Sequence, residues 1–238
     1  MALPVQSTPT YTVKIPSTQE NVKYRPFLIK EEKALLLAQQ SEDPIVMANT
    51  LKNVISSCIV DKVDVEKLAV FDLEYLFTQI RAKSVGESVE LIFACDDCED
   101  EKARVKVNID ISKLEVQRSP EHKNKIELFD DVGVVMKYPN FSSLSALKDL
   151  NTDNIDSIFE IIYNSIDYIY NSAEIFHVSE TPKEEIMDFL YNLTQEQFGK
   201  VQEFFNTMPK ISTSVQYTCP VCSKEHDKVI EGLNNFFQ

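Results

Sequence analysis

Four of the five cysteines in the chain form two pairs with the same internal spacing. Cys95 and Cys98 lie in "FACDDCEDE", and Cys219 and Cys222 lie far downstream in "YTCPVCSKE". A Cys-x-x-Cys turn places two sulfurs on one side of a zinc ion, and two such turns supply the four thiolates of a tetrahedral site. Disulfides are rare in proteins of a reducing compartment, so the spacing predicts a metal or redox centre.

Zinc bound by all four cysteines is the interpretation that this pairing favours. Such a site has no open coordination position, which indicates a structural and not a catalytic ion. Three alternatives remain: four unrelated reduced thiols, a redox pair, or a site in which His226 replaces one cysteine. A redox pair usually opens a helix beside a parallel sheet, and neither pair does so. Cys58, on the apolar face of an expected helix, is predicted to be a core residue.

Alternating apolar residues flank both cysteine pairs. Val89, Leu91 and Phe93 precede the first pair at a spacing of two, and Val105 and Val107 follow it at the same spacing. The second pair is enclosed by "ISTSVQYT" and "DKVIEG". A period of two is typical of strands, so each pair is expected on a turn between two strands.

The apolar period is close to that of a helix in residues 30–83 and 141–209. It changes to two at Gly86 and changes back after Pro139. A further hairpin is expected around Asp130 to Gly133. Within 141–209, apolar residues recur at intervals of three and four and predict one helical stripe, formed by Ile155, Ile158, Phe159, Ile162, Ile166 and Ile169. Capping boxes are expected at Thr181 with Glu184 and at Thr194 with Gln197.

These periods predict an α+β fold. A small, mostly antiparallel sheet would carry the two cysteine knuckles in a zinc-ribbon-like arrangement, with N-terminal and inserted helical segments around it. The expected segments are an N-terminal arm with helices, 1–86; a β region with the first knuckle, 87–140; a helical insertion, 141–209; and C-terminal strands with the second knuckle, 210–238.

The charge of the chain limits its partners. Lys and Arg number 24 against 38 Asp and Glu, a net charge of −14. Nucleic acid and anionic membrane surfaces are therefore not expected as partners, because both attract basic proteins. The N-terminus shows no secretory pattern, and no apolar run reaches the ~18 residues of a membrane span. A cytoplasmic location and a partner with basic surface are expected.

The chain lacks the motifs of common enzymes. It has only four glycines, which leaves no glycine-rich phosphate loop in the usual form. None of its three histidines lies in a zinc-protease motif or beside a serine elbow. No catalytic residue and no small-molecule substrate are therefore expected.

Several stretches together resemble a family of T-even-type bacteriophage proteins, the base plate hub and hub-assembly proteins. The resemblance depends on the order and spacing of "RPFLIKEEKALLLA", "FDLEYLFTQIRAKSVGE", the first Cys-x-x-Cys followed by "VKVNIDISKLEV", and "VVMKYP". These stretches cover residues 25–139, and the second cysteine pair fits more loosely.

The resemblance implies a non-enzymatic role in building the hub of a contractile-tail base plate, as a hub component or as an assembly factor. The implied partners are other phage tail proteins. The implied location is the host cytoplasm during assembly, with the virion base plate as a later destination. A zinc-ribbon adaptor that binds host machinery is the alternative function that a ribbon alone would also fit.

Overall fold

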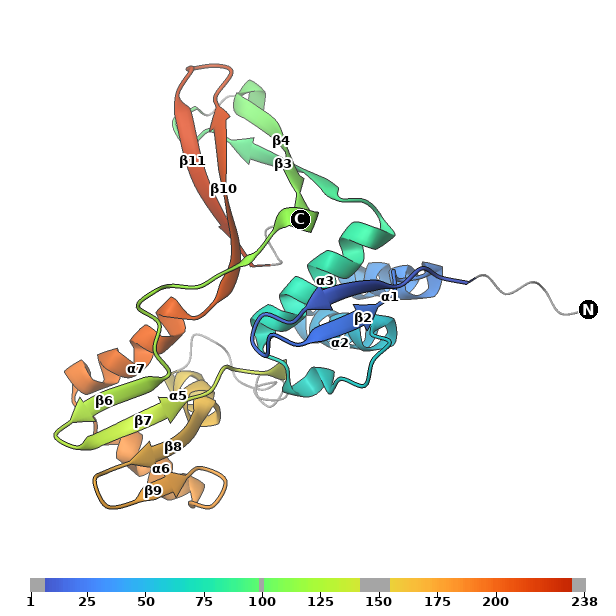
Figure 1. Cartoon of the computed structure of the whole chain (residues 1–238). Helices are drawn as coiled ribbons and strands as arrows, with labels where there is room; N and C mark the ends of the chain where they lie inside the picture. Colours follow the sequence, from blue (N-terminus) through green and yellow to red (C-terminus); the bar gives the residue numbers. More distant parts are fainter. Residues whose placement is uncertain (1–6, 99–100, 142–154, 233–238) are drawn as a thin grey trace, which may run out of the picture. The chain divides into compact units, whose positions relative to one another are not determined.

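The computed structural model describes residues 7–98, 101–141 and 155–232, which form two compact units (Figure 1). One unit, here called the knuckle unit, comprises Met1–Val65, Phe71–Gln117 and Lys210–Gln238. The other, called the insertion unit, comprises Glu66–Val70 and Arg118–Pro209. Among the described residues, no helix is both long enough and apolar enough to cross a membrane.

The N-terminal part of the knuckle unit is a hairpin followed by helices. The hairpin pairs β1 (Tyr11–Lys14) with β2 (Asn21–Tyr24), and the helices are α1 (Ile29–Gln40), α2 (Pro44–Cys58) and α3 (Val70–Ser84). The short 3₁₀ turn η1 (Val65–Lys67) precedes α3 and lies mostly in the segment Glu66–Val70 of the insertion unit. The start of α2 is as predicted from Asp43 and Pro44. The carboxylate of Asp43 accepts hydrogen bonds from the backbone N–H groups of Ile45 and Val46.

Two buried carboxylates attach the N-terminal hairpin and arm to the helices. Asp72, at the start of α3, is fully buried and accepts hydrogen bonds from the backbone N–H and the hydroxyl of Ser17 in the β1–β2 turn. Glu31 of α1 pairs with Arg25 at 2.9 Å and accepts the backbone N–H of Leu28. Burial opposes ionisation of Glu31, but the hydrogen bonds from Arg25 and Leu28 outweigh it and lower its pKa.

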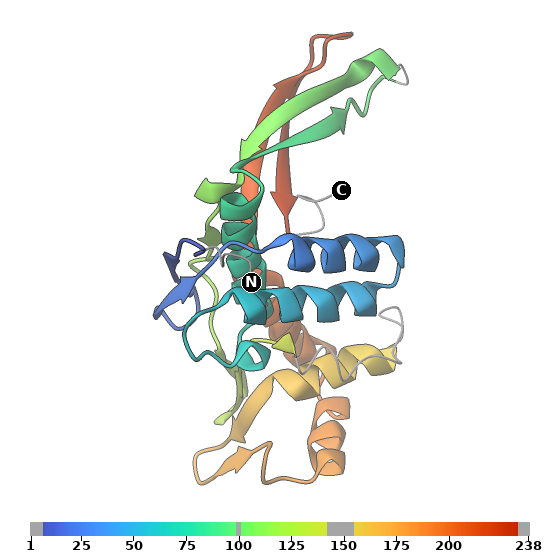
Figure 2. The same cartoon turned by 90° about the vertical axis from the view of Figure 1, so that its right-hand side faces the viewer.

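Two antiparallel hairpins form the rest of the knuckle unit. Their strands are β3 (Ser88–Ala94), β4 (Arg104–Asp110), β10 (Lys210–Thr218) and β11 (Glu225–Glu231); β5 (Val116–Gln117) adds to β10, and η2 (Glu101–Ala103) and η3 (Ile111–Lys113) flank β4. Figures 1 and 2 show the hairpins side by side with their turns at the same end. One core lies between them, made of Ala82, Leu91, Ile109, Ile111, Leu114, Ile211, Val215 and Ile230.

The insertion unit has a sheet and a core of its own. The sheet is antiparallel in the order β6 (Lys125–Phe129), β7 (Val132–Met136), β8 (Ile166–Tyr170), β9 (Ile175–His177), and the helices are α5 (Ile155–Ser165), α6 (Lys183–Tyr191) and α7 (Gln195–Thr207). The fully buried side chains of Val134, Ile162, Ile166, Val201 and Phe204 are part of its core. The mixed α and β fold and the period of two around both knuckles are therefore confirmed.

Two details of the predicted helical block were wrong. The stripe of isoleucines does not form one helix, because α5 ends at Ser165 and Ile166 and Ile169 lie in β8. β8 pairs with β7, placing Ile169 opposite Val134, so β-branched residues complete a sheet and bury the same apolar face. The expected capping box at Thr181 is absent, since its hydroxyl donates instead to the carbonyl of His177. The box at Thr194 is present.

Gly133 and Gly199 offer a matched pair of substitutions that tests the packing of the insertion unit. A Cβ on Gly133 would lie 2.6 Å from the carbonyl oxygen of Ile126 and closer still to the hydroxyl of Tyr170, whereas a Cβ on Gly199 meets nothing within 4 Å. We expect Gly133→Ala to lower the free energy of unfolding by about 1–3 kcal/mol, because β6 and β7 must separate. Gly199→Ala, inside α7, should raise it by about 1 kcal/mol. Chemical denaturation measures both, and equal stability of the two variants would contradict the described packing.

Candidate metal centre

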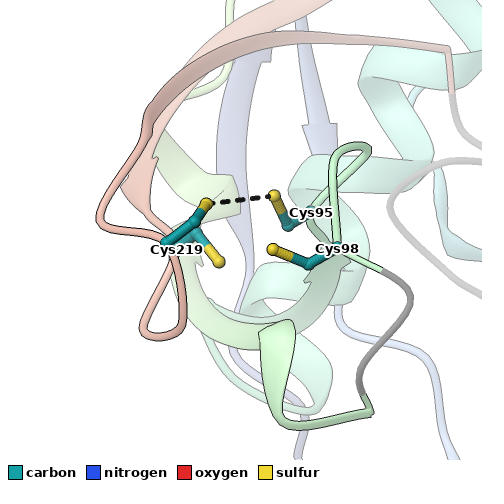
Figure 3. Close-up of side chains that lie close together, drawn as sticks. Cys95, Cys98 and Cys219 are labelled. Carbon is teal, nitrogen blue, oxygen red and sulfur yellow. Dashed lines mark hydrogen bonds between the residues drawn. The ribbon is translucent and has the colours of Figure 1, made fainter.

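The four paired cysteines come together at the turns of the two hairpins. All four Sγ atoms lie within 4.8 Å of one another, and the Sγ atoms of Cys95 and Cys222 are 3.8 Å apart. Figure 3 shows the sulfurs of Cys95, Cys98 and Cys219 pointing toward one another. Cys95 and Cys219 are buried, Cys98 is half-buried and Cys222 is exposed. The predicted convergence of the two pairs is confirmed.

Backbone hydrogen bonds shape the two turns. In the first turn, the N–H of Cys95 donates to the carbonyl of Ala103 at 3.1 Å. In the second, the N–H of Cys219 donates to the carbonyl of Lys224 at 2.9 Å, and the N–H of Val221 donates to the Cys219 sulfur at 3.4 Å. Each hairpin therefore closes directly outside its cysteine pair, which turns the sulfurs toward the neighbouring hairpin.

The thiols of the cluster differ in how readily they ionise. Hydrogen bonds from the backbone N–H groups of Cys222 and Val221 lower the pKa of Cys219 to about 7. The pKa of Cys98 is raised to about 12, because its thiol shares a hydrogen bond with Cys222 and is removed from water. Four sulfurs this close cannot all carry negative charge without a cation among them. The donor set is therefore suited to a soft divalent ion that keeps all four deprotonated.

A stack of three aromatic rings lies next to the cysteine cluster. Phe93 of β3 lies on Tyr217 of β10, with ring centroids 5.2 Å apart, and Tyr217 lies on His226 of β11 at 4.9 Å. The Tyr217 hydroxyl donates to the carbonyl of Ala94 at 3.1 Å. One aromatic stack and one hydrogen bond thus connect the two hairpins next to the cysteines.

His226 lies beside the cluster, and the alternative in which it replaces a cysteine as a ligand stays a prediction. Its Nε2 atom is 3.3 Å from the sulfur of Cys95, and it forms a second close group with Cys95 and Asp97. In the tautomer that carries a proton on Nε2, His226 can donate a hydrogen bond to the Cys95 sulfur, as groups around a metal centre do when they orient its ligands.

Sequence reasoning did not identify the ring stack, although a signal for it was present. Each cysteine pair is preceded at the same interval by an aromatic residue, Phe93 two positions before Cys95 and Tyr217 two positions before Cys219. In a strand, residues two apart lie on the same face, so both rings had to share a face with the first cysteine of their pair. The sequence did not reveal that the two faces meet.

Ion pairs also cross between the two turns. Lys224 pairs with Asp97 at 2.5 Å, and Lys228 pairs with Asp96 at 3.0 Å. All four side chains are at the surface, so the pairs contribute little to stability and mainly set the register of one turn against the other. Cys58, the fifth cysteine, is buried on α2, away from the cluster, and burial raises its pKa to about 11.

A comparison with known protein families identifies the family of this chain. A family model described as T4 bacteriophage base plate protein matches residues 8–238, nearly the whole chain. The chain therefore belongs to the T4 bacteriophage base plate protein family, which confirms the resemblance found in the sequence at the level of the base plate. No curated protein and no solved structure matches the chain significantly.

Mild oxidation of the metal-free protein tests the geometry of the cluster. Because the sulfurs of Cys95 and Cys222 are 3.8 Å apart, we expect an oxidant such as diamide to form a disulfide between the two hairpins. Peptide mapping by mass spectrometry would identify the 95–222 cross-link, and Cys58 should stay reduced as the internal control. Because all four sulfurs lie close together, the decisive variant is Cys98→Ser with Cys219→Ser, which leaves one cysteine in each pair. If this variant did not form the 95–222 cross-link, the hairpins would not meet as described.

Proposed function

We propose that this chain is a non-enzymatic component or assembly factor of the base plate hub, which acts through contacts with other tail proteins and contains one structural zinc ion. Membership of the base plate protein family supports a place in the phage base plate. The main observation in support of zinc is that four cysteine sulfurs converge from two hairpins that are distant in sequence. Cys95, Cys98, Cys219 and Cys222 are the proposed ligands.

The distances between the sulfurs support zinc. A tetrahedron with Zn–S bonds of about 2.3 Å has sulfur–sulfur edges of about 3.8 Å, and the sulfurs of Cys95 and Cys222 lie 3.8 Å apart. Four thiolates leave no coordination position for water, so the ion would hold structure and would not activate a nucleophile. His226 would contribute a hydrogen bond to Cys95 and not a fifth ligand.

A zinc ion at this place would join two hairpins of the knuckle unit that are far apart in sequence. β3–β4 and β10–β11 are separated by residues Arg118–Pro209 of the insertion unit, and the entropy of closing such a loop rises only with the logarithm of its length. Apparent zinc affinities in small structural sites are roughly 10–16 kcal/mol at neutral pH, which exceeds that entropy. The ion would therefore keep the two hairpins together while partner proteins bind.

The protein would be made in the host cytoplasm and then meet the growing tail. Its net charge of −14 favours partners with basic surface and disfavours nucleic acid, which is bound through Lys and Arg. An assembly factor would leave the particle after the hub forms, and a hub component would remain in it. These two outcomes are distinguished by the composition of the mature virion.

Zinc content is the first test. We expect protein purified without chelator to contain about one zinc per chain, the stoichiometry of a single four-cysteine site, and Cys219→Ser to lose most of it. Cys58→Ala, which removes the cysteine outside the cluster, should keep the zinc. Hydrogen exchange should become faster in β3–β4 and β10–β11 of Cys219→Ser but not in α6 and α7, because the insertion unit has a separate core. The metal centre would be refuted if the native protein contained no zinc and if its hydrogen exchange matched that of Cys219→Ser.

The role in the tail is tested with phage. Without this gene, we expect infected cells to accumulate tail parts but no complete base plates, because the hub does not form. Complementation with Cys58→Ala should restore infectious particles, and Cys219→Ser should restore few. Mass spectrometry of purified virions then separates a retained component from a released factor. Normal tails in the absence of the gene would contradict the proposal and would favour the alternative of an adaptor for host machinery.

A further inference from the structure

The insertion unit contains a groove that neither the metal centre nor the family assignment accounts for. The groove has a volume of about 280 Å³ and lies where β9 and the β6–β7 turn meet α6. Six of its lining residues are apolar: Phe129, Val132, Ile169, Phe176, Ile186 and Phe189. The groove that they line is called the phenylalanine groove here.

The walls of the phenylalanine groove are exposed, whereas its floor is part of the core. Phe129 is 40% exposed and Phe176 is 38% exposed, although a phenylalanine ring gains about 1.5–3 kcal/mol from full burial. Ile186 and Ile169 are buried beneath them. Two partly exposed aromatic rings, one from the edge strand β6 and one from the edge strand β9, line one depression and form a surface suited to a large apolar side chain from a partner.

The rim of the groove is acidic. Glu185 lines it directly, Asp130 and Asp131 connect Phe129 to Val132, and Glu180 precedes the lining residue Thr181. Glu174 lies two residues before Phe176. All of these carboxylates belong to surface turns or to the first turn of α6, and the electrostatic field at the groove is therefore negative.

The lysines nearest to the groove already have partners. Lys183, next to Glu185 along the chain, is paired with Glu160 at 2.6 Å. Lys200 donates to the carbonyl of Leu128, and Lys125 lies over the ring of Tyr170 at 4.7 Å. The charge of Lys183 is thereby compensated by Glu160, whereas Lys125 keeps its charge beside the lining residue Tyr170 and offsets one of the carboxylates near the groove.

We propose that the phenylalanine groove binds a segment of another tail protein that presents a large apolar side chain flanked by lysine or arginine. The apolar side chain would enter between Phe129 and Phe176, and a basic neighbour would meet Glu185. This inference rests on the proposed function, because it supplies the contact through which a base plate protein would act. A second copy of the chain fits less well, since a chain of net charge −14 would bring a negative surface to a negative rim.

The small size of the groove determines how the partner is held. A depression of this volume accepts one or two side chains and buries far less area than a stable protein–protein interface. The contact is therefore expected to be weak alone, with an association rate that depends on ionic strength, as is typical of electrostatically guided encounters. Several such contacts on one base plate would act together.

Selection from a library of random peptides tests the proposal with the full-length protein as bait. We expect enriched peptides to contain an aromatic or leucine residue with lysine or arginine within a few positions. Phe176→Ser should weaken their binding about tenfold or more, because removing one ring that buries such a side chain forfeits at least ~1.4 kcal/mol. Glu185→Lys should weaken binding and reduce its dependence on salt.

Controls separate this contact from unfolding and from other surfaces. Ile92→Ser removes an apolar side chain that is 60% exposed on β3 of the knuckle unit and should leave binding unchanged. Thermal unfolding of Phe176→Ser and Glu185→Lys verifies that both variants fold. Peptides without basic residues, an absence of enriched peptides, or binding that is insensitive to both groove substitutions would each overturn the proposal. So would a dimer of the chain that Phe176→Ser dissociates.

The two proposals can fail independently. Zinc content and the yield of base plates depend on the cysteine cluster and on the gene as a whole, and neither measurement involves the phenylalanine groove. If the peptides fail but zinc binds and base plates require the gene, only the groove is refuted. If peptides bind as expected but base plates form without the gene, the proposed function is refuted and the groove remains a docking site.

Discussion

Repulsion between closely spaced thiolates is the constraint on which the knuckle unit depends. Four sulfurs within 4.8 Å of one another form a stable arrangement only if most stay protonated or a cation lies among them. The surrounding structure keeps them close in either case. The stack of Phe93, Tyr217 and His226 and the bond from the Tyr217 hydroxyl to Ala94 align the hairpins, and the shared core beneath adds apolar burial from both. Backbone donors on the second turn lower the pKa of Cys219 and so favour its thiolate.

The distance in sequence between the two cysteine hairpins explains how the chain is divided. The strands that carry the second knuckle come from the end of the chain, so the intervening residues have to leave the knuckle unit and return to it. A long excursion adds little entropy to closing the loop, but it has to be stable itself. The insertion unit meets this requirement with a four-stranded sheet and a separate core that includes Val134, Ile166 and Phe204. Each unit therefore has a hydrophobic core of its own.

An acidic surface and membership of the base plate family point to a protein that works by contact. A net charge of −14 favours partners with basic surface, because opposite charges accelerate encounters. In the insertion unit, exposed aromatic rings and carboxylates occur together at the phenylalanine groove. In the knuckle unit the charges are instead paired across the hairpin turns, as in Lys224 with Asp97. The two units thus present different surfaces, with exposed aromatic rings and carboxylates at the groove of the insertion unit and ion pairs at the turns of the knuckle unit.

The sequence by itself determined the local features of this protein. The two Cys-x-x-Cys turns, the strands on both sides of them and the caps at Asp43 and Thr194 follow from short-range chemistry, so they were predicted correctly. The tertiary structure decided what depends on contacts between distant segments. A run of isoleucines satisfies a helix and a strand equally well, and only the free edge of β7 places Ile166 and Ile169 in a strand. The position of His226 beside Cys95, the ring stack and the pairing of β6–β7 with β8 likewise required the fold, because no local pattern shows which apolar faces meet.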